Sequence, residues 1–358
     1  MIQRVAVVGA GTMGLGIAQL CAQSGFSVKI HDALPAALAA LPAKLKKSFD
    51  TAVLKGKLST QQAERAFHSV SAVADINDLA GADLVIEAAP EDLALKQELF
   101  KRLSGICQDA LLATNTSSLS VAEIMKHAQS PERTMGVHFF NPPVAMKLVE
   151  MIRTEKTSPE AFQAAWEFLL MGLRRTPVDV KDVPGFIVNR VMRPYYVTAQ
   201  RMVSSRTSCA AVDEGARGIG GVPMGPFELM DLIGLDTNLA ITTAIYEALG
   251  RPERFAPPAL QKKLVEAGEL GRKAGKGFYI YDNGKKIGEN PRVLNGLAPG
   301  TISTAKDIWS NLAGAVILEA ERLVAEGTAG KSDIDTAVRL AMNFPKGPFE
   351  WQKESTAA

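Results

Sequence analysis

The fold is decided by the stretch Val5-Ala6-Val7-Val8-Gly9-Ala10-Gly11-Thr12-Met13-Gly14, close to the start of the chain. Four apolar residues predict a buried strand, and the glycine-rich turn after them opens a helical pattern that reaches residue 23. In a G-x-G-x-x-G turn, Gly9 permits the tight bend, Gly11 lets the backbone approach a pyrophosphate, and Gly14 allows close helix–strand packing. With Thr12 and Met13, these glycines predict a dinucleotide-binding helix N-terminus.

A carboxylate stands where such a turn needs one. Asp32 follows a second predicted strand, residues 27–31, and lies 18 residues after Gly14. At this position a carboxylate binds the ribose hydroxyls of the dinucleotide. It would repel a 2′-phosphate, and Ala33-Leu34 supply no arginine to hold one, so NAD is favoured over NADP. The alternative is a structural glycine turn with a surface aspartate.

Short apolar runs and helical segments continue to alternate up to about residue 180. Further strands are predicted at residues 84–88, 111–114, 134–139, 147–152 and 176–180. This alternation is typical of βα units and a parallel sheet. The alternation of strand and helix patterns ends at Val183-Pro184-Gly185, after which helical periodicity dominates to about residue 270. We therefore predict an α/β Rossmann-type domain over residues 1–183 and an all-α domain over residues 184–286.

The C-terminal segment repeats part of this helical domain. Ala199-Gln200-Arg201-Met202-Val203 corresponds to Ala320-Glu321-Arg322-Leu323-Val324 at an offset of 121, and residues 223–228 correspond to residues 345–350 at an offset of 122. A repeat that occurs once is too short for a solenoid and indicates a duplicated helical module. Residues 304–358 are thus predicted to form a partial second copy, and residues 287–303 a linker.

Composition narrows the class of protein. The 358 residues include 40 Lys and Arg against 38 Asp and Glu, a net charge of +2, which argues against nucleic acid or an anionic membrane surface as the main partner. Neither a signal peptide nor an apolar run long enough for a membrane span is seen. Cys21, Cys107 and Cys209 are scattered and odd in number, which fits a reducing compartment. A cytoplasmic enzyme without a metal site is expected.

Two polar residues on neighbouring predicted strands form the candidate catalytic pair. His138 lies near the end of residues 134–139, and Glu150 lies in the next extended run, after a short loop. A carboxylate that orients an imidazole makes histidine a usable proton acceptor near neutral pH, which suits hydride removal from an alcohol carbon. On spacing alone, a core histidine and a surface salt bridge remain alternatives.

Further polar groups stand where a substrate could bind. Asn115-Thr116-Ser117-Ser118 follows a predicted strand, at the carboxyl edge where open α/β sheets bind ligands. A helix N-cap is the alternative for these hydroxyls. Asn189 lies at the otherwise apolar start of a helix and needs a polar partner, which either a site or a backbone bond could supply.

Several strings in order along residues 1 to 285 resemble the (S)-3-hydroxyacyl-CoA dehydrogenase family, including its short-chain 3-hydroxybutyryl-CoA members. The strings are residues 8–14, Asn115-Thr116-Ser117-Ser118-Leu119, residues 138–142, Met146-Lys147-Leu148-Val149-Glu150, residues 182–190, residues 223–229 and Gly275-Lys276-Gly277-Phe278-Tyr279. The resemblance implies NAD-dependent oxidation of (S)-3-hydroxyacyl-CoA to 3-oxoacyl-CoA, as in the β-oxidation of fatty acids. It also implies that the helical domain serves substrate binding and dimerisation, with the substrate in a cleft between the two domains.

Carried over position by position, the resemblance assigns roles to single residues. His138 would be the general base, oriented by Glu150, while Ser117 and Asn189 would hydrogen-bond the reacting oxygen or the thioester end. Positions that contact NAD in the family correspond to Glu91, Lys96, Asn141 and Lys273. Positions that contact CoA correspond to Ser48 and Lys55, which are seven residues apart and so share a helix face, with Lys44 beside them. A solvated helix face is the alternative for these last residues.

Two other functions remain open from the sequence: a dehydrogenase of a free hydroxy acid or sugar acid, and a non-catalytic NAD-binding protein. The second helical copy has no counterpart of His138 or Glu150, so one active site per chain is expected. Family members with one helical domain generally dimerise through it. This chain is therefore expected to be a homodimer, or a monomer in which the second copy packs on the first as an internal partner. Acyl chain length depends on apolar contacts that the sequence does not specify.

Overall fold

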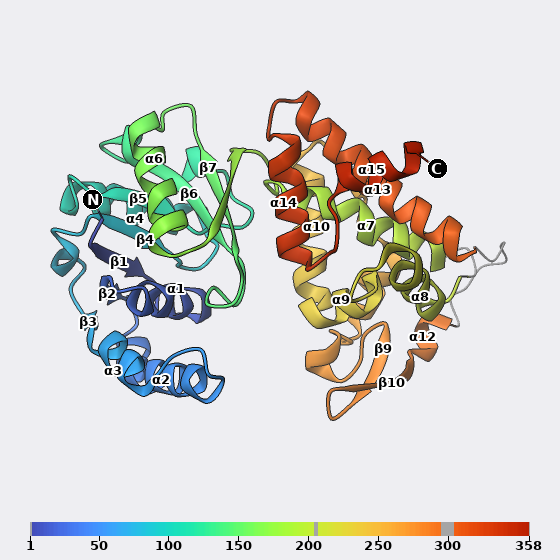
Figure 1. Ribbon diagram of the computed structural model, residues 1–358, viewed down its shortest axis with the longest axis horizontal. Coiled ribbons are helices and arrows are strands. Elements are labelled where there is room, and N and C mark those ends of the chain that lie inside the picture. The colour runs from blue at the N-terminus through green and yellow to red at the C-terminus, as the bar shows by residue number, and fades with distance from the viewer. Residues whose placement is uncertain (1, 204–206, 295–303, 358) are drawn as a thin grey trace. The chain divides into compact units, whose positions relative to one another are not determined.

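The computed structural model describes residues 2–203, 207–294 and 304–357 (Figure 1). The chain divides into two compact units, Met1–Val183 and Pro184–Ala358. Each unit buries apolar side chains of its own, so each has its own core.

An eight-stranded sheet forms the centre of the first unit (Figure 1). Its order, β3-β2-β1-β4-β5-β6-β7-β8, is that of a Rossmann-type sheet extended by two strands. Strands β1 to β6 run parallel, whereas β7 is antiparallel to β6 and parallel to β8. The eight strands span, in chain order, Arg4–Val8, Ser27–His31, Val70–Val73, Leu84–Glu87, Leu111–Thr114, Thr134–Phe139, Leu148–Arg153 and Thr176–Lys181. This architecture confirms the predicted fold class of the first unit.

One strand, β3, is missing from the sequence-based expectation. It lies at the edge of the sheet, pairs only with β2, and has side chains that are at most half-buried. An edge strand of four residues needs no continuous apolar run, so its sequence carries little strand signal.

Six helices connect these strands. They are α1 (Thr12–Gln23), α2 (Pro35–Leu54), α3 (Thr60–His68), α4 (Leu93–Ile106), α5 (Val121–Ile124) and α6 (Pro159–Glu167). A π-helical turn, Phe168–Gly172, continues α6, and 3-10 turns cover Ile76–Leu79 and Pro131–Arg133. Buried side chains of α1, such as Ile17 and Leu20, join Val7, Ile30 and Ile86 of the sheet in one hydrophobic core. This packing holds the N-terminus of α1 at the carboxyl edge of the parallel strands.

The second unit is mainly helical. Its first part contains α7 (Val188–Val203), α8 (Cys209–Gly220), α9 (Pro226–Ile233), α10 (Leu235–Ala248) and α11 (Ala259–Glu266), with 3-10 turns at Glu253–Phe255 and Arg272–Ala274. Its last part contains α13 (Ala305–Ala325), α14 (Lys331–Met342) and α15 (Pro348–Ala357). Between them lie a hairpin of β9 (Tyr279–Asp282) and β10 (Lys285–Glu289) and the short helix α12 (Pro291–Leu294).

The hairpin corrects two expectations from the sequence. The second unit is not purely helical. Of the predicted linker, residues 287–289 belong to β10 and residues 291–294 to α12, while residues 295–303 lie outside the described residues. The cause is a buried carboxylate: Asp231 on α9 accepts hydrogen bonds from the backbone N–H groups of Phe278 and Tyr279, both at 2.9 Å. Asn290, also buried, donates to the carbonyl of Gly277 at 2.7 Å. The hairpin is thereby tied into the helical unit by contacts distant in sequence.

The repeat seen in the sequence is also visible in the structure. In the first copy, Asp213 on α8 accepts a hydrogen bond from the N–H of Phe227 at the start of α9, at 2.9 Å. In the second copy, Asp335 on α14 accepts one from the N–H of Phe349 at the start of α15, at 2.8 Å. The three helices α7 to α9 thus correspond to α13 to α15, and α13 packs against α7 and α8 (Figure 1).

Candidate active site

The glycine turn has the geometry of a phosphate cradle. A Cβ atom at Gly9, whose φ is +108°, would lie 2.5 Å from the carbonyl oxygen of Ala88, and one at Gly14 would overlap the carbonyl oxygen of Gly9. Nothing lies within 4 Å of the Cβ position at Gly11, and Gly11 and Thr12 are exposed at the start of α1. Gly9 and Gly14 therefore let strand and helix pack closely, and Gly11 leaves the N-terminus of the helix accessible. The N–H groups and the dipole at this N-terminus favour binding of a pyrophosphate.

Asp32 is hydrogen-bonded to the backbone of this turn. Its carboxylate accepts hydrogen bonds from the N–H of Ala10 at 2.7 Å and from the N–H of Leu34 at 2.9 Å, one to each oxygen. A carboxylate has about four acceptor positions, so two remain for the hydroxyls of a ribose. The cradle and this carboxylate together fit an NAD molecule.

His138 and Glu150 face each other across an antiparallel pair of strands. The register of β6 and β7 places them directly opposite, and Nδ1 of His138 lies 2.7 Å from Oε2 of Glu150. Both side chains are buried, Glu150 completely. Because a carboxylate accepts hydrogen bonds, Nδ1 carries the hydrogen in this pair, and Nε2 is left with a lone pair on the other side of the ring. This is the arrangement of a general base.

Ser117 meets the other side of the same ring. Its Oγ lies 3.1 Å from Nε2 of His138, so the hydroxyl donates to the lone pair. The loop that carries Ser117 follows β5 and is held by Glu91, whose Oε1 accepts hydrogen bonds from Thr116 Oγ1 at 2.6 Å and from the N–H groups of Ser117 and Ser118 at 3.0 and 3.1 Å. Burial opposes ionisation of Glu91, but the Thr116 hydroxyl and the charge of Lys96 bring its pKa below the ordinary value.

Lys96 is buried behind this loop, with 1% of its surface exposed. Its Nζ lies 2.6 Å from Oε1 of Glu87 and 3.4 Å from Oε2 of Glu91. Glu87, which has no exposed surface, also accepts hydrogen bonds from the N–H of Ala89 and from Thr114 Oγ1, both at 2.6 Å. Lys96 thus lies between two carboxylates at the edge of the sheet and forms an ion pair with each, and direct contact with NAD stays a prediction.

The predicted CoA residues lie on and after α2. Ser48 Oγ donates to Oε1 of Gln19 at 2.5 Å, which leaves the serine oxygen as an acceptor toward solvent. Lys55 directly follows α2 and is exposed, as is Lys44. A cationic surface of this kind can meet the phosphates of CoA, and the binding itself stays a prediction.

The remaining predicted residues are placed as follows. Asn141 is exposed and lies two residues after the end of β6. Asn189 lies in the first turn of α7, where its carbonyl accepts a hydrogen bond from Nε of Arg193 at 3.0 Å. Lys273 Nζ lies 2.7 Å from each carboxylate oxygen of Asp236. Asn189 and Lys273 belong to the second unit, so their part in a site with His138 stays a prediction.

Two contacts that support the site were not foreseen from the sequence: that of Gly16, and the backbone bond made by Asn115, which was named there only as part of a polar string. A Cβ atom at Gly16 would lie 2.8 Å from Cδ of Pro143, so this glycine lets the loop after β6 approach α1. Asn115 accepts a hydrogen bond from the N–H of Phe139 at 2.8 Å and so ties the end of β5 to the end of β6. A fourth glycine, two residues beyond the glycine motif, was the available signal for the first of these.

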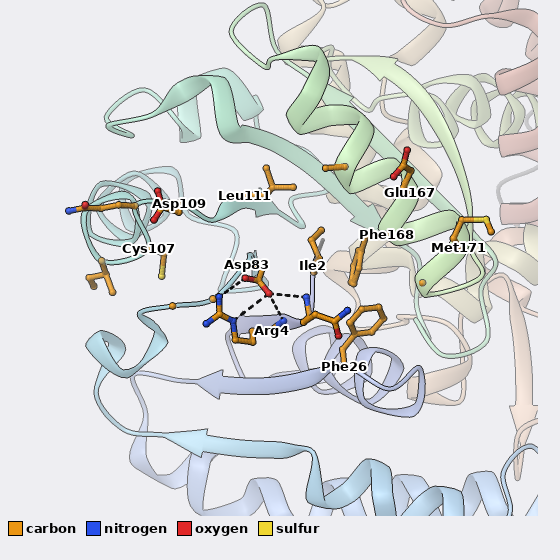
Figure 2. Close-up of a pocket in the computed structure, with 17 residues that line it drawn as sticks. Ile2, Arg4, Phe26, Asp83, Cys107, Asp109, Leu111, Glu167, Phe168 and Met171 are labelled. Atoms are coloured by element: carbon orange, nitrogen blue, oxygen red, sulfur yellow. Dashed lines mark hydrogen bonds and ion pairs between the residues drawn. The ribbon is translucent and has the colours of Figure 1, made fainter.

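A cavity of about 1170 Å³ lies at the opposite edge of the sheet (Figure 2). It is lined at the amino ends of the strands, where Arg4 forms an ion pair with Asp83 at 2.7 Å and Phe26 packs edge-on against Phe168. His138 and the glycine turn lie at the carboxyl ends of these parallel strands. This cavity is therefore separate from the candidate active site.

Fold and site together define an NAD-dependent dehydrogenase of the Rossmann class, with an imidazole–carboxylate pair beside the dinucleotide cradle. The comparisons with known proteins specify the family. Residues 4–183 match the model of the 3-hydroxyacyl-CoA dehydrogenase NAD binding domain, and residues 185–281 and 308–357 match that of the 3-hydroxyacyl-CoA dehydrogenase C-terminal domain. The chain belongs to the 3-hydroxyacyl-CoA dehydrogenase family, which confirms the resemblance, and NAD is its cofactor.

Individual relatives span most of the chain. A 3-hydroxyadipyl-CoA dehydrogenase of Escherichia coli K12 is 34% identical over 98% of this chain and 90% of its own length. A 3-hydroxybutyryl-CoA dehydrogenase of Mycobacterium tuberculosis H37Rv is 40% identical over 78% of this chain and 99% of its own length. The crystal structure of 3-hydroxybutyryl-CoA dehydrogenase from E. coli K12 substr. MG1655 matches with a TM-score of 0.90 and 32% identity, covering 99% of this chain and 92% of its own. In the parts of our chain that the structure describes, no helix combines the length and apolarity of a membrane span.

Proposed function

We propose that this protein oxidises an (S)-3-hydroxyacyl-CoA to the 3-oxoacyl-CoA. The observation that carries the proposal is the hydrogen-bonded series Glu150–His138–Ser117, at 2.7 and 3.1 Å, at the same edge of the sheet as the glycine cradle. NAD, when bound, accepts the hydride from C3 of the substrate. Names of relatives that act on hydroxyacyl-CoA thioesters support the choice of substrate class.

The chain's own groups handle the proton and the orientation. Nε2 of His138 takes the proton of the 3-hydroxyl group, and Glu150 stabilises the imidazolium that forms. The Ser117 hydroxyl, released from Nε2 when substrate binds, donates to the reacting oxygen, and Asn189 holds the same oxygen or the thioester end. Holding both reactants in line supplies much of the acceleration.

We assign the cofactor contacts to two groups of residues. The pyrophosphate binds at Gly9, Gly11, Thr12, Met13 and Gly14, and the ribose hydroxyls bind Asp32. The nicotinamide half is bordered by Glu91, Asn141 and Lys273, with Lys96 behind Glu91. The CoA tail binds along Ser48 and Lys55, where the cations near the end of α2 meet its phosphates.

An assay of NADH absorbance tests this proposal. The substrates are 3-hydroxyacyl-CoA thioesters of increasing chain length and the matching free 3-hydroxy acids, each offered with NAD and with NADP. We expect turnover of thioesters with NAD, and much weaker turnover with NADP because Asp32 repels the 2′-phosphate. Turnover of the free acids alone would favour the second candidate, a dehydrogenase of a free hydroxy acid or sugar acid.

We also propose that the second helical copy acts as an internal partner for the first and leaves the chain monomeric. Ile308 and Trp309 of α13 press on Gly215 and Gly220 of α8, at positions where any Cβ atom would crowd them. Relatives of the shorter type match 78% of this chain over 99% of their own length, so this chain has additional residues. Three buried free thiols, at Cys21, Cys107 and Cys209, support a cytoplasmic location.

A further inference from the structure

The turn that leads into α7 is under backbone strain. Gly185 and Phe186 have φ values of +78° and +49°, and a Cβ atom at Gly185 would lie 2.6 Å from Cδ1 of Ile245. A left-handed phenylalanine costs free energy and persists only where the surroundings hold it in place. The residues that hold this turn in place therefore also hold the first turn of α7, which carries Asn189.

Arg190, the neighbour of Asn189, is held by the second copy. Its side chain is 2% exposed. Nε donates to Oε1 of Glu319 at 2.9 Å, and the two terminal nitrogens donate to the two oxygens of Glu326, both at 2.7 Å. Glu319 lies in the second half of α13 and Glu326 directly follows it, and together they fix the guanidinium in position and in orientation.

A second arginine holds the same turn from the first copy. Arg193 donates from Nε to the carbonyl of Asn189 at 3.0 Å. Its Nη1 donates to the carbonyl of Asn238 at 3.3 Å and to Thr242 Oγ1 at 3.4 Å, both on α10. The backbone around Asn189 is thus clamped between α10 and α13.

The clamp from α13 departs from the symmetry of the repeat. At the offset of 121, the counterpart of Arg190 is Asn311, and the counterparts of Glu319 and Glu326 are Thr198 and Ser205. In a symmetric interface each contact occurs twice. The arginine and the two acids of the fork have uncharged residues at all three counterpart positions in the sequence, and Asn311 donates to the carbonyl of Asp307 on its own helix.

We propose that Glu319 and Glu326 are positioning residues, which fix the substrate-binding Asn189 through Arg190. This inference rests on the proposed function, in which Asn189 contacts the substrate. Buried ion pairs contribute little net stability compared with apolar packing, whereas their directional bonds specify geometry. The second copy thereby positions a substrate-binding residue in addition to packing on the first copy.

A double-mutant cycle tests the inference. Steady-state kcat and KM for (S)-3-hydroxybutyryl-CoA and NAD are measured for the full chain and for Glu326→Gln, Asn189→Ala and the double variant, with melting temperatures alongside. Glu326 is the acid of choice because its side chain is 47% exposed, so the folded state should survive its loss. We expect Glu326→Gln to lower kcat/KM for the thioester about fivefold, to leave the Kd of NAD unchanged, and to have less than about twofold effect in the Asn189→Ala background.

Two further variants separate positioning from folding. Glu326→Asp keeps the charge and should restore part of kcat/KM, whereas Glu321→Gln on the same helix, whose carboxylate binds Gln352, should change nothing. An equal loss from Glu326→Gln in both backgrounds would overturn the inference and leave the proposed function intact. An Asn189→Ala variant with full activity would overturn the role of Asn189 itself, and with it the inference.

Discussion

At the scale of single residues, burial decides which groups can react. Glu150 and Glu87 are both fully buried carboxylates, but they differ in their partners. Glu87 faces the ammonium of Lys96, so its charge is neutralised within the sheet edge. Glu150 faces the imidazole of His138, and the other ring nitrogen lies 3.1 Å from the Ser117 hydroxyl. The two acids therefore differ in their surroundings: Glu87 is bound by Lys96, Thr114 and the backbone of Ala89, whereas Glu150 orients the His138 ring, as the proposed mechanism requires.

The role of His138 predicts a large loss on its replacement. His138→Gln should lower kcat about a hundredfold or more, because base catalysis is worth roughly 10²–10⁴. NAD binding, measured by titration calorimetry, should be unchanged, since the glycine cradle and Asp32 are untouched. His127→Gln, at an exposed position, is the matched control. Near-normal turnover of the His138 variant would remove the residue from the mechanism.

At the scale of elements, each copy of the helical module contains a close contact between a glycine and an aspartate on the preceding helix. Gly225 and Gly347 lie so close to Asp213 and Asp335 that a Cβ atom at either glycine would overlap the carboxylate. Each aspartate caps the following helix by accepting its backbone N–H groups. The glycine lets the helix N-terminus reach the carboxylate, and this contact fixes the angle between the helices in both copies.

This geometry predicts opposite effects for two glycine substitutions in the second copy. Gly347→Ala should lower the free energy of unfolding by about 1–3 kcal/mol, because the added methyl group overpacks a buried contact. Gly314→Ala, in the middle of α13 with open space around its Cβ position, should raise it by about 0.5–1 kcal/mol. Denaturant unfolding measures both, and equal stability of the two variants would contradict the overlap.

The aspartate of the first copy makes stability depend on pH. Burial raises the pKa of Asp213 to about 7, against the hydrogen bonds from Tyr279 and Phe227 that favour the ionised form. A carboxyl group with a raised folded-state pKa stabilises the protein fully below its unfolded pKa near 4 and loses this contribution as the pH rises to about 7.

The wild-type protein should therefore lose stability relative to Asp213→Asn between pH 4 and pH 7. Denaturant unfolding at pH 4.5 and at pH 7.5 gives the free energy of unfolding of both proteins. The wild-type value minus the variant's should be lower at pH 7.5 than at pH 4.5 by about 2 kcal/mol or more. Asp282→Asn, on the exposed hairpin, should leave the wild-type slope as it is. A constant gap between wild type and Asp213→Asn would show that the carboxyl group titrates normally.

At the scale of the whole molecule, the proposal that the second copy is an internal partner predicts the number of subunits. A chain that ends near Leu297 lacks α13 to α15 and uncovers the faces of α7 and α8 on which α13 packs. We expect light scattering to show a monomer of 38.3 kDa for the full chain and self-association of the shortened one. An unchanged number of subunits together with unchanged solubility would count against the internal partner.

Much of the fold follows from local patterns. The buried strand before Gly9, the helix after it and six of the other seven strands of the sheet were predictable because each repeats a short apolar or helical period. The edge strand β3 and the hairpin β9–β10 were not, because β3 has a weak pattern and the hairpin is anchored by Asp231, 47 and 48 residues away from its two backbone partners.

The candidate site divides in the same way. Gly9, Gly14, Asp32 and the pair of His138 and Glu150 could be named in advance, since a turn or a neighbouring strand brings each of them to the sheet edge. The four hydrogen bonds that Glu91 accepts, and the burial of Lys96, depend on where the loop after β5 settles against α4. Residue types and their spacing do not specify such contacts.

The sequence by itself determined the class of fold, the dinucleotide turn and the duplicated module, because backbone geometry at glycine and periodic burial act within a few residues. Only the tertiary structure decided which atoms meet: the ring of His138 between Glu150 and Ser117, and Arg190 between two acids more than 120 residues further along the chain. Hydrogen bonds and ion pairs act over about 3 Å. They are set by the register of strands and the packing of helices, which no short stretch of sequence contains.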